Sequence, residues 1–236
     1  MRDPDPALPA PTAARPLLGL TVLVVEDSRF ASEAIRLLCL RSGARIRRAD
    51  CLASARRHLQ VYRPNVAIID VGLPDGSGVD LISALAGETK QVEVILGLSG
   101  DDGAEAEARA AGVDGFLLKP VESLGVFQDA ILRHMPAARR PSGPRVVSSE
   151  RVEPDRLALR DDMAHAAELL TERGDGPSVD YIAQFLGGLA RTARDPDLAQ
   201  AAGDLAQSSR TGQAVGKMLE RVTTIVRARL AEPAPL

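Results

Sequence analysis

Mostly apolar, strand-length runs alternate with helix-length amphipathic segments five times between about residues 20 and 135. The apolar runs lack the period-two pattern of half-exposed strands, and this is typical of parallel strands buried on both faces. We expect strands at 20–25, 45–49, 66–69, 92–98 and 114–118, and helices at about 28–41, 52–61, 79–86, 103–111 and 122–134. The pattern therefore predicts an α/β fold: a five-stranded parallel sheet built from five βα units, with helices on both faces.

The pattern changes after this region. Residues 136–154 are rich in proline, serine and arginine without periodicity, which predicts an interdomain linker. From residue 155 onward only helical periodicity remains, in four apolar stripes that predict a small all-α bundle over 155–236. Gly187 and Gly188 fall inside the second of these helices, where they either weaken it or allow another element to approach closely.

Several residues predict where elements begin. Ser28 and Asp50 are expected to cap the first two helices, and Ser178 and Asp195 the second and third helices of the bundle. A turn is expected at 174–177. Residues 1–17, rich in proline and alanine, are expected to form a disordered leader before a domain at 18–135.

Polar side chains follow four of the five strand-like runs. Glu26 and Asp27 follow the first, Asp70 ends the third, Ser99 follows the fourth and Lys119 follows the fifth. In an open parallel sheet, ligands bind outside the carboxyl ends of the strands, so these residues are expected to converge. Three acids, a hydroxyl and a lysine suit a divalent cation together with a phosphoryl group.

This set resembles the receiver domain of bacterial two-component response regulators over about residues 18–135. The acidic pair, the acceptor aspartate, the hydroxyl and the Lys119-Pro120 dipeptide match that family in order and spacing, and Phe116 matches its aromatic switch position. Each residue alone could be a helix cap or a strand end, but the joint pattern favours the site. The resemblance implies a flavodoxin-like, CheY-like fold.

The resemblance also implies roles for single residues. Asp70 would be the nucleophile that is phosphorylated, with Ser99 and Lys119 contacting phosphoryl oxygens. Mg²⁺ would be held by Glu26, Asp27, Asp70 and the Gly72 carbonyl. Movement of Ser99 would let Phe116 turn inward and act as a switch. Such a protein is a phosphoacceptor, not an enzyme in the usual sense, and its donor is a histidine kinase or histidine phosphotransferase.

Composition adds few constraints. The 236 residues carry a formal net charge of −3, which gives no overall attraction to nucleic acid or anionic membranes. No apolar run approaches the roughly 20 residues that a membrane span needs. The two cysteines, Cys39 and Cys51, have no metal-binding neighbours and are interpreted as reduced packing residues. The expected location is the cytoplasm.

The second domain has no recognised family. Residues 150–236 hold 11 Lys/Arg against 14 Asp/Glu, and no helix concentrates basic residues, so a DNA-binding output is not expected. The favoured function is contact with a downstream protein, or dimerisation, controlled by the receiver. One alternative is phosphotransfer through His165, although acidic residues surround it and Glu168 occupies a position where phosphotransfer domains favour lysine. The other is a scaffold that works without phosphate.

Overall fold

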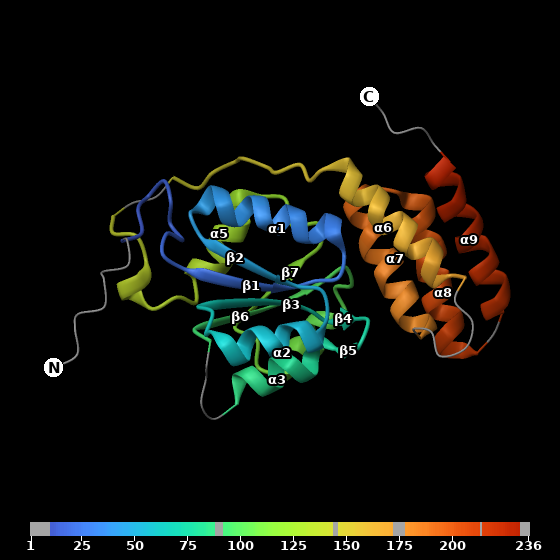
Figure 1. The fold of residues 1–236 in the computed structure, drawn as a ribbon, viewed down its shortest axis with the longest axis horizontal. Helices are drawn as coiled ribbons and strands as arrows, with labels where there is room; N and C mark the ends of the chain where they lie inside the picture. Colours follow the sequence, from blue (N-terminus) through green and yellow to red (C-terminus); the bar gives the residue numbers. More distant parts are fainter. Residues whose placement is uncertain (1–9, 88–91, 144–145, 172–177, 213, 232–236) are drawn as a thin grey trace.

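The computed structural model describes residues 10–87, 92–143, 146–171, 178–212 and 214–231, which form an α/β part followed by a helical bundle (Figure 1). The α/β part contains a five-stranded sheet in the order β2-β1-β3-β6-β7, and every neighbouring pair is parallel. The expected five-stranded parallel fold is therefore confirmed. Its strands are β1 (Thr21–Val25), β2 (Arg45–Ala49), β3 (Val66–Asp70), β6 (Val94–Ser99) and β7 (Gly115–Leu118).

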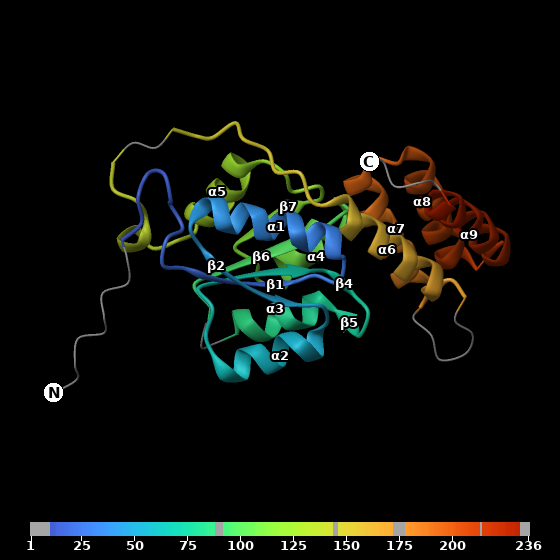
Figure 2. The ribbon, with the colours of Figure 1, turned by 45° about the horizontal axis from the view of Figure 1, so that its top comes forward.

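Helices cover both faces of this sheet, as Figures 1 and 2 show. The five helices are α1 (Arg29–Ser42), α2 (Leu52–Val61), α3 (Gly78–Ala86), α4 (Ala104–Ala110) and α5 (Leu124–Leu132). One buried core lies between the sheet and α1 with α5, and a second lies between the sheet and α2, α3 and α4. Side chains of successive residues in β1, β3 and β6 enter these two cores alternately, so these strands are almost entirely apolar. The edge strand β2 differs, since it carries three arginines and most of its residues are exposed or half-exposed.

Local differences from the expected elements have identifiable causes. A short hairpin, β4 (Gly72–Leu73) with β5 (Gly76–Ser77), follows the third strand, and a 3-10 turn, η1, covers Ala137–Arg139. Ser28 caps α1 as expected, accepting from Ala31 N at 3.0 Å. The prediction for Asp50 is wrong, because Cys51 occupies the N-cap of α2 and the carboxylate of Asp75 accepts from its first two amides.

The C-terminal part is a bundle of four helices: α6 (Arg156–Leu169), α7 (Val179–Ala193), α8 (Pro196–Thr211) and α9 (Val215–Ala231). Leucine, alanine and valine side chains from all four form one core. Ser178 and Asp195 cap α7 and α8 as expected. The turn expected at 174–177 lies outside the described residues. No helix of the described chain is long and apolar enough to cross a membrane.

Segments on either side of the sheet domain are also attached to it. Leu17, the last residue of the expected leader, is fully buried, and its amide donates to Ser42 O at 2.9 Å. At the end of the expected linker, Val152 enters the core under α1 and α5. Its amide donates to Glu122 O at 2.9 Å. The chain is thus held to the sheet domain until shortly before α6 begins.

The bundle contacts the sheet domain at the start of α1. Asp162 of α6 is 2% exposed and accepts three hydrogen bonds: from Ser28 Oγ at 2.7 Å, Arg29 N at 2.9 Å and Phe30 N at 2.9 Å. The first amides of a helix have no partner within the helix, and its dipole favours an anion there. The carboxylate of Asp162, from the second domain, therefore accepts hydrogen bonds from the free amides at the start of α1 in the first domain.

This contact predicts that Asp162→Ala weakens the docking of the bundle on α1. The variant leaves three donors without their charged acceptor, which costs about 1–3 kcal/mol. We expect faster hydrogen exchange at Phe30 and a lower midpoint of urea unfolding. Asp161→Ala is the matched control, since Asp161 pairs with Arg29 where both side chains are more than half exposed and such pairs contribute little. Equal effects of the two substitutions would contradict the role given to Asp162.

Candidate functional site

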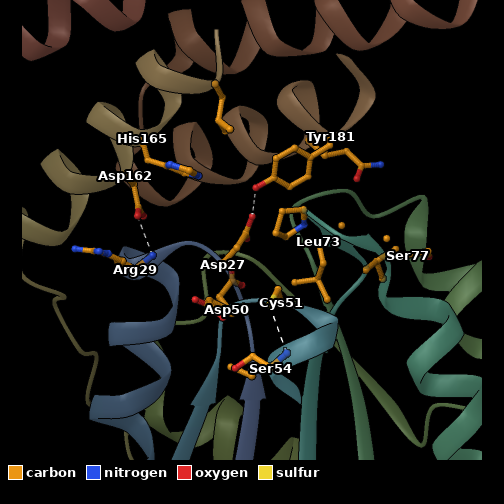
Figure 3. A pocket seen from close by; sticks show the side chains of 18 of the residues that line it. Asp27, Arg29, Asp50, Cys51, Ser54, Leu73, Ser77, Asp162, His165 and Tyr181 are labelled. Atoms are coloured by element: carbon orange, nitrogen blue, oxygen red, sulfur yellow. Dashed lines mark hydrogen bonds between the residues drawn. The ribbon is translucent and has the colours of Figure 1, made fainter. Parts of the chain in front are cut away.

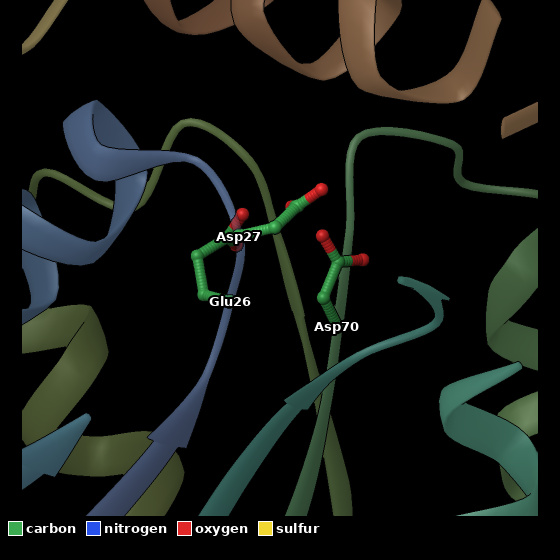
Figure 4. A group of neighbouring side chains, drawn as sticks. All are labelled: Glu26, Asp27 and Asp70. Carbon is green, nitrogen blue, oxygen red and sulfur yellow. The ribbon is translucent and has the colours of Figure 1, made fainter. Parts of the chain in front are cut away.

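The acidic residues expected to converge do so at the carboxyl end of the sheet. Glu26 and Asp27 follow β1, and Asp70 ends the neighbouring strand β3 (Figure 4). One carboxylate oxygen from each lies within 4.8 Å of the others. This is also where the strand order changes direction, between β1 and β3, which is the usual ligand-binding position in doubly wound sheets.

Lys119 lies against this cluster from the end of β7. Its Nζ is 2.6 Å from both Asp70 Oδ2 and Glu26 Oε2. All three residues are buried, with exposed fractions between 3% and 7%. Burial alone would lower the pKa of Lys119, but the carboxylates of Asp70 and Glu26 outweigh it, so the pKa is raised and the ammonium stays charged.

One lysine does not balance three acids. Burial raises the pKa of Glu26 well above its ordinary value, and the charges of Asp70 and Asp27 add to the effect of burial. Burial, followed by the charge of Asp70, raises the pKa of Asp27 to about 6. The cluster thus carries an excess of negative charge that is costly in this environment.

The excess charge and the donor chemistry fit a hard divalent cation. Three carboxylates at a sheet edge match the oxygen ligands that Mg²⁺ prefers. Glu26 Oε2 is buried, and its partner within the described chain is the ammonium of Lys119 at 2.6 Å. The fit to such a cation therefore comes from the three clustered carboxylates, of which one lysine neutralises only part.

The remaining expected residues surround Asp70. Gly72 donates its amide to Asp70 Oδ1 at 3.1 Å, and its carbonyl belongs to the short β4 strand. Ser99 is nearly buried, and its hydroxyl accepts from Asp101 N at 3.0 Å. Phe116 is half-buried on β7, and its ring lies against Gly97. A Cβ added to Gly97 would lie 2.8 Å from Phe116 Cδ2. The five strand-end residues are therefore brought to one end of the sheet, whereas Phe116 lies further back on β7, paired with Gly97 of β6.

A feature that sequence reasoning missed lies above this cluster: helix α7 of the second domain crosses it (Figure 4). Tyr181 is buried and donates its hydroxyl to Asp27 Oδ2 at 2.5 Å. Burial, then the charge of Asp27, raises the pKa of this tyrosine, so it remains a proton donor. Gln184 packs on Gly72, where an added Cβ would be 2.4 Å from Gln184 Oε1.

The other end of α7 is also attached. Arg194, the C-cap of α7, pairs with Glu122 Oε2 at 2.8 Å, and Arg151 pairs with the same carboxylate. Glu122 lies three residues after Lys119 in the chain. With Tyr181 bound to Asp27 near one end and Arg194 bound to Glu122 at the other, α7 lines the cavity that contains Asp70. Asp70 is left 6% exposed beneath it.

Cavities lie between the two domains in the described part of the chain. A broad one of about 1580 Å³ is lined by Asp27, Cys51, Tyr181 and His165, among others (Figure 3). His165 stacks edge-on against Phe185, with ring centroids 5.6 Å apart. A smaller cavity of about 220 Å³ is lined by Asp70, Ser99 and Lys119 from the sheet and by α7 and α8 from the bundle. His165 lines the broad cavity and not the smaller one.

Comparison with known proteins identifies part of the chain. Residues 22–130 match the family model of the response regulator receiver domain. The chain is 32% identical over 120 residues to the transcriptional regulatory protein KdpE of Mycobacterium tuberculosis, covering 50% of this chain and 53% of that protein. It is 29% identical over 161 residues to the regulator of RpoS of Escherichia coli, covering 67% of this chain and 47% of that protein. The chain thus spans about half the length of these relatives.

Solved structures give similar matches. A putative response regulator from Chloroflexus aurantiacus is 28% identical, with a TM-score of 0.43, covering 48% of this chain and 93% of that one. The chemotaxis protein CheY4 of Vibrio cholerae is 24% identical, with a TM-score of 0.45, covering 49% of this chain and 98% of that one. The family model ends at residue 130, before the helical bundle begins.

The crowding of carboxylates predicts that, without divalent metal, Asp27→Asn stabilises the protein at pH 7. With a folded pKa near 6 against 3.8 when unfolded, Asp27 binds its proton more tightly in the folded state. The free energy of unfolding therefore falls as pH rises from about 4 to 6, and the loss persists above. We expect the variant to gain roughly 1–3 kcal/mol at pH 7 and nothing near pH 4.

Urea unfolding in the presence of a chelator measures this difference. Asp102→Asn, at an exposed position in the loop after Ser99, serves as the control and should change little. Added Mg²⁺ should stabilise the unsubstituted chain more than Asp27→Asn. A variant no more stable than the parent at pH 7 would contradict the analysis.

Proposed function

We propose, on the premise that residues 22–130 belong to the response regulator receiver family, that this chain is a phosphoacceptor of a two-component system whose second domain reads the state of Asp70. In this proposal residues 18–135 are the receiver, 136–154 the linker and 155–236 the output domain. The observation that supports it is the position of α7, which lies across the cavity lined by Asp70. A change at Asp70 therefore acts directly on the second domain.

The proposed chemistry transfers a phosphoryl group from a phosphohistidine. A carboxylate oxygen of Asp70 forms a bond to phosphorus while the bond from phosphorus to the histidine nitrogen breaks, and that nitrogen keeps the electron pair. Lys119 already donates a hydrogen bond to Asp70. In the phosphorylated state its ammonium group would instead pair with a phosphoryl oxygen. Ser99 would donate its hydroxyl to another oxygen.

The proposed metal ligands are the three clustered carboxylates, together with a backbone carbonyl that the family resemblance implies. Glu26, Asp27, Asp70 and the carbonyl of Gly72 would hold Mg²⁺, which supplies neutralisation of the carboxylates and of the phosphoryl oxygens when bound. Tyr181, hydrogen-bonded to Asp27, links α7 to this ligand set. Ser99 and Phe116 would move together on phosphorylation, as in a two-state switch.

The proposed output is contact with another protein, or with a second copy of the chain, made by the helical domain. The names of KdpE and related relatives describe transcriptional regulators, and that description belongs to those proteins. In this chain the helical region carries more acidic than basic residues, which does not favour a DNA footprint. The donor would be a histidine kinase or phosphotransferase, and the place of action the cytoplasm.

We expect Mg²⁺ with acetyl phosphate to add one phosphoryl group to the chain, and Asp70→Asn to prevent it. Intact-mass measurement followed by peptide mapping detects the group on Asp70. Asp75→Asn is the matched control, since Asp75 follows in the same loop but caps α2. Phosphate on another residue, or unchanged labelling of Asp70→Asn, would refute the acceptor assignment. No labelling with Mg²⁺ bound would favour the phosphate-independent scaffold.

The phosphotransfer alternative predicts a second site. Because His165 lines the broad cavity and not the one containing Asp70, we expect His165→Gln to be labelled as fully as the unsubstituted chain. His58→Gln controls for the loss of a histidine elsewhere. Mapping at neutral pH would find phosphohistidine if it forms. Phosphate found on His165, or a slower loss of the phosphoryl group from Asp70 in His165→Gln alone, would establish the alternative.

A further inference from the structure

One face of α7 is directed at the acceptor region. Tyr181, Gln184, Gly188 and Arg191 recur at three- and four-residue spacing, so they share one side of the helix. Tyr181 contacts Asp27 and Gln184 contacts Gly72, as described above. The two remaining members of this face contact the residues that surround the phosphoryl position.

Gly188 allows the backbone of α7 to approach closely. A Cβ added to Gly188 would lie 3.8 Å from Lys119 Nζ, and a Cβ added to Gly100 would lie 3.0 Å from Gly188 Cα. Gly100 directly follows Ser99. The glycine pair of α7 therefore does not break the helix; Gly188 brings it against the loop that begins with the candidate phosphoryl-binding hydroxyl.

Arg191 lies one turn further along α7, and its guanidinium group reaches the loop at Gly100. A Cβ on Gly100 would lie 2.7 Å from Arg191 Nη1, and Arg191 lines the 220 Å³ cavity together with Asp70, Ser99 and Lys119. In the described part of the chain, no carboxylate lies within ion-pair distance of its guanidinium. By contrast, Arg194 on the next turn is paired with Glu122.

The charge balance of the site changes on phosphorylation in a way that favours an additional cation. Three carboxylates, one lysine and a bound Mg²⁺ sum to zero. Converting Asp70 to its acyl phosphate replaces one negative charge by two, so the cavity gains a negative charge that nothing in the sheet domain neutralises. A guanidinium can donate two parallel hydrogen bonds to phosphoryl oxygens.

We propose that the phosphoryl site is shared between the two domains, with Arg191 of α7 as a phosphoryl-binding residue opposite Lys119, so that phosphorylation holds the bundle on the receiver. This inference rests on the proposed function of Asp70. Arg191 adds binding energy for the phosphoryl group only while α7 is docked. By thermodynamic reciprocity, the group then favours docking by the same factor.

The test uses the full chain with Mg²⁺ and beryllium trifluoride, an anion that binds aspartate in place of a phosphoryl group. Fluorine NMR titration measures its affinity, and hydrogen exchange of α7 measures docking, with α9 as a reference within the bundle. For Arg191→Gln we expect about 3- to 10-fold weaker anion binding, since the guanidinium is partly in solvent, with smaller differences at high salt. Arg191→Lys should recover part of the affinity.

The effect of the anion on hydrogen exchange in α7 distinguishes phosphoryl binding by Arg191 from a purely structural role of this residue. In the unsubstituted chain the anion should slow exchange in α7, and in Arg191→Gln it should not. Arg194→Gln is the matched control: it removes an arginine that anchors the same helix, so it should speed α7 exchange even without the anion. Equal anion affinity in Arg191→Gln and parent, or faster α7 exchange on anion binding, would overturn the inference. Failure of the parent to bind the anion would overturn the function proposed for Asp70 itself.

Discussion

Three carboxylates and one ammonium group, gathered where little water reaches them, are the constraint on which the rest of this structure depends. Glu26, Asp70 and Lys119 are nearly excluded from solvent, and burial and mutual repulsion raise the pKa of two of the acids. Charges in such a place require partners, because isolated ions are costly to bury. The parallel sheet supplies the rigid frame that keeps them together, since each sits at a strand end held by neighbouring strands.

The second domain takes part in the same electrostatic balance. Its contacts with the first domain are mainly polar: a tyrosine on Asp27, a carboxylate on the start of α1 and an arginine on Glu122. Interfaces of this kind hold two domains in a defined orientation while remaining responsive to charge. A change of charge at Asp70 is thus a change within the interface, with no intervening pathway required.

The sequence was sufficient for the sheet and for the residues at its edge. Buried parallel strands leave continuous apolar runs, and ligand-binding residues follow these runs directly, so both signals are local. The contacts of α7 were not predictable in this way. Tyr181 and Gln184 look like ordinary members of an amphipathic helix, and nothing nearby in the sequence names Asp27 or Gly72 as their partners. Asp162 likewise looks like one of several acids on α6, although it completes a helix 130 residues earlier.

Helix capping shows the same limit on a smaller scale. Asp50 has the composition of a cap, yet the first amides of α2 are bound by Asp75 from a hairpin that follows β3. The net charge of the helical region was also a poor guide to its surface. Although acidic overall, it presents Arg191 to the cavity lined by Glu26, Asp27 and Asp70, and it pairs Arg194 with Glu122.

The pairing of residues 150–152 with 122–124 limits how the two domains can separate. Because Val152 is anchored in the core of the sheet domain and α6 begins at Arg156, the free chain between them is only a few residues long. A bundle that leaves α1 would pivot about this short hinge and stay at an effective concentration of the order of millimolar. Any molecule that competes with α7 for the cavity lined by Asp70 must therefore displace a neighbour that stays tethered beside it.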